Sequence, residues 1–119
     1  MNLFPHNVKY VSTKRSIQGG RSSGDLANFN LALHVNDSEE NVLANRFKLK
    51  THYNLPSEPV WINQIHSSIC MDTSKINSFK KADATFTSKS GVVCGILTAD
   101  CLPVFISRAD GSMVGIAHA

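Results

Sequence analysis

The sequence predicts an α+β fold that is rich in strands, with mixed sheets flanked by helices. One segment has helical periodicity, whereas several short apolar runs bounded by glycine, proline and aspartate have the pattern of strands. The 119 residues, 42% hydrophobic and 18% charged, suffice for a hydrophobic core and are typical of a globular protein. We therefore expect a single domain over residues 1–119.

The predicted helix lies in residues 36–50, with the sequence NDSEENVLANRFKLK. Asp37 and Glu40 have the three-residue spacing of a capping box. Apolar residues such as Val42 and Phe47 then recur between charged ones, as they do along a surface helix. This is the helix that we expect to cover the sheet.

Short runs of β-branched and aromatic residues predict the strands. The expected strands are residues 8–11, 28–35, 59–66, 83–88, 91–99, 103–107 and 112–117. Asp110 and Gly111 predict a hairpin turn between the last two strands, and the glycine-rich segment 14–24 predicts a loop. Segment 91–99 is apolar on both sides of a strand, so we expect more cover for the sheet than one helix provides.

Composition and charge exclude several classes of protein. The net charge of +3 is spread along the chain, with a loose basic cluster at Lys14, Arg15 and Arg21, whereas nucleic-acid binders carry a denser basic stripe. The N-terminus lacks a secretory signal, and no apolar run is long enough to cross a bilayer. Three cysteines without CxxC spacing argue against a disulfide framework and a zinc finger. We expect a cytoplasmic protein that binds neither nucleic acid nor membranes.

Three side chains that can bind a metal lie at the ends of predicted strands: His66, Cys101 and His118. If they converge, two imidazoles and one thiolate form an open zinc site of the catalytic kind. The same donors also suit copper. Alternatively, Cys101 as nucleophile and His118 as its base would suit a cysteine hydrolase. Each residue also has a structural reading, because buried cysteines and histidines often only pack or hydrogen-bond in a core.

Two aspartates are candidates to orient such ligands. Metal-bound histidines commonly donate their second ring N–H to a carboxylate, and Asp83 and Asp100 both lie beside predicted strands. A role in a turn or at a strand end is the alternative for each. The other cysteines, Cys70 and Cys94, are interpreted as buried apolar residues.

Several strings of the sequence occur in the order typical of one known family. The strings are GDLANFNLALHVND, ENVLANRFKL, PVWINQIHSS, KADATFTSKSGVVCGILTADCLPVFI and GIAHA. They resemble the multicopper polyphenol oxidase (laccase-domain) family, also described as purine nucleoside phosphorylase or peptidoglycan editing factor. The resemblance implies a layered α/β/β/α fold of the laccase-domain type. In that family the last motif continues as Gly-Trp-Arg-Gly, so we expect this chain to be the N-terminal half of the domain, ending inside an active-site motif.

The resemblance also implies roles for particular residues. His66, Cys101 and His118 would be the catalytic residues and the zinc ligands. The substrate-binding candidates are Gln64, Asn30 and Arg15. The implied activity is phosphorolysis of adenosine, inosine, guanosine and methylthioadenosine, together with deamination of adenosine, so purine nucleosides and phosphate are the expected partners. Alternatives are a copper polyphenol oxidase, a Cys-His hydrolase of cell-wall precursors, and an inactive fragment that self-associates or lacks its C-terminal half.

Overall fold

The computed structural model describes residues 3–76 and 80–119, which divide between two compact units. The sheet unit comprises Met1–Tyr10 and Pro59–Ala119, and the helix unit comprises Val11–Glu58. The expectation of a single domain over residues 1–119 stays a prediction. Within the described residues, no helix has the length and apolar character needed to cross a membrane.

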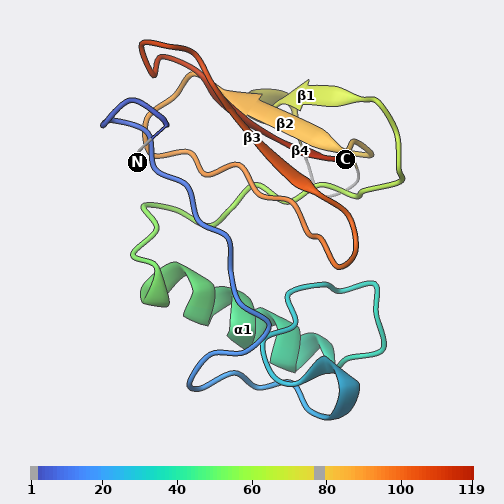
Figure 1. Cartoon of the computed structure of the whole chain (residues 1–119). Coiled ribbons are helices and arrows are strands. Elements are labelled where there is room, and N and C mark those ends of the chain that lie inside the picture. The colour runs from blue at the N-terminus through green and yellow to red at the C-terminus, as the bar shows by residue number, and fades with distance from the viewer. Residues whose placement is uncertain (1–2, 77–79) are drawn as a thin grey trace. The chain divides into compact units, whose positions relative to one another are not determined.

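The sheet unit contains a four-stranded mixed sheet with the order β1-β2-β4-β3 (Figure 1). Its strands are β1 Cys70–Asp72, β2 Ala84–Thr87, β3 Pro103–Ser107 and β4 Val114–His118. Strand β1 runs parallel to β2, whereas β4 is antiparallel to both β2 and β3. With one α-helix in the other unit, this mixed sheet confirms the predicted strand-rich α+β fold.

The predicted hairpin between β3 and β4 is confirmed. The Arg108 N–H donates to the Met113 carbonyl at 2.9 Å, which closes the turn. Gly111 has a φ of 74°, a left-handed conformation that glycine adopts without steric cost, and the Asp110 carboxylate accepts from the Ser112 N–H at 3.0 Å. The turn residues therefore fix the pairing of these two strands locally.

The predicted strands 59–66 and 91–99 are wrong, because these segments meet in an isolated bridge without a ladder. Beyond this bridge, the side chain of Gln64 forms the hydrogen bonds between the two segments. Its amide Nε2 donates to the Leu97 carbonyl at 2.7 Å, and its Oε1 accepts from the Leu97 N–H at 2.7 Å. A side-chain amide thus makes the two hydrogen bonds that a neighbouring strand would otherwise make.

In the helix unit, helix α1 spans Glu39–His52. Ser38 is its N-cap, since its hydroxyl oxygen accepts from the Asn41 N–H at 3.1 Å. The predicted capping box of Asp37 and Glu40 is therefore wrong by one residue. Asp37 instead lies just outside the helix, where its carboxylate accepts from the Ser38 N–H at 2.8 Å.

The predicted strand 28–35 is also wrong, although its buried positions alternate as expected. Phe29 and Leu31 are 4% and 8% exposed. The backbone between them does not pair with a strand, because the Asn45 side chain donates to the Asn30 carbonyl at 2.8 Å. The segment forms turns, and a short 3-10 helix, η1 Gly24–Leu26, precedes it. Segment 8–11 likewise forms no strand.

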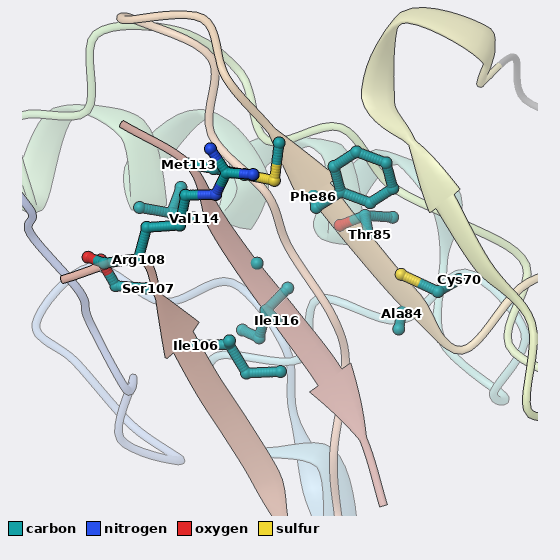
Figure 2. A pocket seen from close by; sticks show the side chains of 11 residues that line it. Cys70, Ala84, Thr85, Phe86, Ile106, Ser107, Arg108, Met113, Val114 and Ile116 are labelled. Atoms are coloured by element: carbon teal, nitrogen blue, oxygen red, sulfur yellow. The ribbon is translucent and has the colours of Figure 1, made fainter. Parts of the chain in front are cut away.

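An apolar groove of about 270 Å³ lies on the sheet unit and is lined by residues of all four strands (Figure 2). Gly115 pairs with Ile106 on one side and with Phe86 on the other, so these three residues share one face of the sheet. Since Gly115 has no side chain, the face is hollow between its neighbours. Ile106 is 55% exposed, so the groove leaves apolar surface open to solvent.

Replacing Asn45 by alanine should destabilise the helix unit. Its fully buried side chain accepts from the Arg21 N–H and donates to the Ser22 hydroxyl and the Asn30 carbonyl. Removing it leaves buried polar groups unpaired, which costs about 1–3 kcal/mol for such a group. Urea unfolding of Asn45→Ala measures this, with the exposed helix variant Lys50→Ala as the control. Equal free energies of unfolding for the two variants would contradict the prediction.

The open groove should bind a fluorescent dye that recognises apolar surface. Large exposed apolar patches bind such molecules, and Ile106 supplies much of this one. We expect the dye signal of the purified 119-residue chain to fall in Ile106→Lys, because the charged side chain removes apolar area and adds a solvated charge. An unchanged dye titration in that variant would place the apolar surface elsewhere.

Candidate metal centre

His66, Cys101 and His118 come together in the sheet unit. Each offers one ligand atom, and these atoms all lie within 4.8 Å of one another. The two imidazole rings have their centroids 5.0 Å apart. Three segments distant in the sequence therefore present two imidazoles and one thiol at a single place, as the sequence predicts.

The pairing of β3 with β4 accounts for two of the three residues. Pro103, the first residue of β3, is the register partner of His118, the last residue of β4. Beyond them, Leu102 and Ala119 exchange backbone hydrogen bonds at 3.0 and 2.9 Å. Cys101 precedes Leu102, so the antiparallel ladder itself brings the thiol to the end of β4, beside His118.

His66 reaches the same place through a bend in the backbone. It has a φ of 60°, a left-handed conformation that is uncommon for residues other than glycine. Three consecutive amides, those of Ile65, His66 and Ser67, donate to the carboxylate of Asp83 at 3.1, 3.0 and 2.7 Å. The Ser67 hydroxyl adds a fourth hydrogen bond at 2.8 Å. The bend that carries His66 is thus built around one carboxylate.

The same carboxylate holds His118. The Nδ1 atom of His118 lies 2.8 Å from Asp83 Oδ2, and the two side chains are 7% and 2% exposed. Burial opposes ionisation of Asp83, but hydrogen bonds from His118, Ser67 and Ile65 outweigh it and hold the pKa of this carboxyl well below its usual range. An ionised carboxylate only accepts, so this hydrogen bond assigns a proton to Nδ1 of His118, which leaves Nε2 as the ring nitrogen that a metal can bind.

This donor set fits a transition metal. Two imidazoles and a thiolate suit zinc or copper, whereas magnesium and calcium prefer oxygen ligands. Cys101 is a free, half-buried thiol and His66 is exposed, so the donor set lies where solvent can reach it. Three protein ligands with one open position are typical of catalytic rather than structural zinc sites.

Of the two aspartates considered from sequence, Asp83 hydrogen-bonds the ring of His118 and the backbone N–H of His66, whereas Asp100 is exposed. The sequence analysis missed Ser67, because no local pattern indicates that its N–H and hydroxyl bind the carboxylate of Asp83, 16 residues away. The interpretation of Cys70 as buried is wrong, because it begins the edge strand β1 and is exposed. Cys94 is half-buried, and burial raises the pKa of its thiol.

The predicted substrate-binding residues are held by hydrogen bonds within their own units. The Gln64 amide, two residues before His66, is engaged by the backbone of Leu97. In the helix unit, Arg15 donates to the carbonyls of Asp25 and Ala27. The side-chain amide of Asn30 donates to the carbonyl of Ala32 and to the carboxylate of Asp37, and its oxygen accepts from the Ala32 N–H. Their roles in substrate binding stay predictions.

Comparison with known proteins agrees with this picture. Purine nucleoside phosphorylase YfiH of Escherichia coli (strain K12) is 39% identical over 116 residues, which cover 97% of this chain and 47% of that protein. A purine nucleoside phosphorylase of Haemophilus influenzae is 35% identical over 115 residues, covering 97% of this chain and 46% of that protein. The chain thus spans about half the length of the curated relatives it matches.

Solved structures show the same fold. A crystal structure of a Neisseria meningitidis protein of the family DUF152 has a TM-score of 0.86 and 37% identity, covering 98% of this chain and 47% of that one. YlmD from Geobacillus stearothermophilus has a TM-score of 0.75 and 27% identity, covering 85% and 42%. The family model described as multi-copper polyphenol oxidoreductase laccase matches residues 9–119. By that match, and by its identity to these relatives, the chain belongs to this laccase-like family.

Proposed function

We propose that this chain is the N-terminal half of a zinc-dependent purine nucleoside phosphorylase that also deaminates adenosine. The observation that carries the proposal is the convergence of His66, Cys101 and His118, with ligand atoms within 4.8 Å of one another. The names of the curated relatives support the substrate class. The proposed substrates are adenosine, inosine, guanosine and methylthioadenosine with phosphate, and the proposed location is the cytoplasm.

In this proposal His118 Nε2, a ring nitrogen of His66 and the Cys101 thiolate would hold the zinc ion. When bound, zinc supplies Lewis-acid chemistry and lowers the pKa of water to about 7, which suits attack on a purine ring. Cys101 must give up its thiol proton to bind the metal. Asp83 holds the ring of His118 and the backbone of His66 in place while substrate enters from the exposed side of His66.

Phosphorolysis requires groups that bind phosphate and nucleoside as well as a metal. Phosphate attacks C1′ of the ribose as the bond from C1′ to the base breaks, and cations stabilise the developing charge. We propose Arg15 for the phosphate, and Gln64 and Asn30 for the nucleoside. Residues outside these 119 would complete the domain in the proposed enzyme.

Copper polyphenol oxidation is the second candidate, favoured by the description of the matching family model. The two candidates use the same donors and differ in the metal and the substrate. Elemental analysis of the purified full-length protein, with assays of nucleoside turnover in phosphate buffer and of phenol oxidation, tests both. Zinc with nucleoside turnover supports the first proposal, and copper with phenol oxidation overturns it.

Cys101→Ser should lower zinc content and nucleoside turnover together. A hydroxyl is a poor zinc ligand, so the loss in affinity should exceed the roughly 10- to 100-fold that an outer-shell partner costs. Elemental analysis and turnover are measured on the same samples of the full-length protein. Cys70→Ser, at an exposed cysteine outside the donor set, is the matched control. Full zinc occupancy with abolished turnover would favour a cysteine nucleophile instead.

Alkylation of Cys101 should be slow until a chelator removes the metal. A zinc-bound thiolate is shielded, whereas a nucleophile activated by His118 reacts readily without metal. Peptide mass spectrometry after iodoacetamide treatment reports each cysteine separately, and exposed Cys70 serves as the internal reference. Fast alkylation of Cys101 that a chelator does not change would contradict the zinc proposal.

A further inference from the structure

We propose that Asp83 is the positioning residue of this centre, because its one carboxylate sets both the backbone of His66 and the ring tautomer of His118 before any metal binds. The inference rests on the proposed metal-binding role of the histidines and Cys101, and it extends that role to a residue outside the donor set. Asp83 directly precedes β2, whose first residue pairs with Ala117 of β4, so the sheet brings the carboxylate to the neighbouring His118.

The first half of the proposal concerns the backbone of His66. Its φ of 60° lies in the left-handed region, which is unfavourable for a residue with a Cβ. The N–H groups of Ile65, His66 and Ser67 all point at Asp83, an arrangement of successive amides that binds anions. Hydrogen bonds to an ionised acceptor are about twice as strong as neutral ones, so the carboxylate offsets the strain.

The second half concerns the ring of His118. Asp83 Oδ2 is shared between the His66 N–H at 3.0 Å and His118 Nδ1 at 2.8 Å. Asp83 also holds the main chain of His118, since its carbonyl accepts from the His118 N–H at 2.7 Å. Both side chains are almost fully buried, so water does not replace these contacts. The imidazole is therefore fixed in position and in tautomer, with Nε2 as its free donor atom.

The pattern of donors makes an amide a poor substitute for the carboxylate. Oδ1 of Asp83 faces the N–H of Ile65 and both the N–H and the hydroxyl of Ser67. An NH₂ group there would meet three donors. If the NH₂ group stood at the Oδ2 position, it would face the His66 N–H and the Nδ1 of His118. Nδ1 could accept a hydrogen bond from it only if the ring proton moved to Nε2. In catalytic triads the same replacement leaves the geometry and selects the wrong tautomer.

The decisive measurement is the tautomer of His118 in the metal-free, ¹⁵N-labelled full chain. Long-range ¹H–¹⁵N correlation distinguishes protonated from unprotonated ring nitrogens, and the loss of signals in His118→Gln identifies the residue. We expect the Nδ1–H form in the wild type and the Nε2–H form in Asp83→Asn. The matched control is Asp72→Asn, which should keep the wild-type tautomer of His118. In the wild type the Asp72 carboxylate accepts from the Ser74 N–H at 2.9 Å and lies outside the donor set.

Metal affinity gives the second readout. Asp83→Asn should bind zinc about 10- to 100-fold more weakly than the wild type, as loss of an outer-shell partner usually does, whereas Asp72→Asn should bind normally. A wild-type His118 without a proton on Nδ1 would overturn the proposal, even if Asp83→Asn fails to fold. Unchanged tautomer and affinity in a folded Asp83→Asn would also overturn it. A third outcome is that both proteins show the expected tautomers but the wild type binds no metal. That result would refute the proposed function, whereas the inference that Asp83 sets the tautomer of His118 would stand.

Discussion

One buried carboxylate, that of Asp83, organises the candidate centre. A charge removed from water is tolerated only when it is paired and hydrogen-bonded, and here five donors surround it: three backbone amides, one hydroxyl and one imidazole. These donors come from the bend at residues 65–67 and from the end of β4. Hydrogen bonding to the Asp83 carboxylate therefore brings the backbone of His66 and the ring of His118 close together. The two histidines are neighbours because both bind the same charged group.

Both units use a polar side chain, fully buried in the case of Asn45 and half-buried in that of Gln64, where the backbone lacks a regular partner. Asn45 supplies hydrogen bonds to loop backbone in the helix unit, and Gln64 does so for Leu97 in the sheet unit. Because buried backbone groups must be paired, these side chains replace ladders that the short strands do not provide. The irregular segments are thus specified as firmly as the strands, but by individual amides and carboxylates rather than by a repeating pattern.

Two different activities are named among the proteins and the family model that match this chain, and the same three metal-binding side chains could serve either activity. The matching family model is described as a copper oxidoreductase, whereas the curated relatives are named purine nucleoside phosphorylases. Two imidazoles and a thiolate are compatible with zinc and with copper. The fold and the donors are common to both proposals, so the metal that the protein carries and the substrate it turns over distinguish them.

Features that depend on neighbouring residues follow from the sequence alone. These are the helix near 39–52 and the hairpin with its Asp110-Gly111 turn. Local rules suffice there, because caps, turns and periodicity act over a few residues. Recognition of family motifs then suggested the metal ligands, which spacing alone left open.

The choice between an orienting role and a turn role for Asp83, and between strand and loop for segments 28–35 and 91–99, follows from tertiary contacts. These contacts join a side chain to a partner far away in the sequence: Gln64 and the backbone of Leu97 are 33 residues apart, and Asp83 and the ring of His118 are 35 apart. The alternation of apolar residues indicates which positions are buried. It does not indicate which distant donor or acceptor forms the hydrogen bond that a backbone N–H or carbonyl needs. The packing of the chain makes that choice.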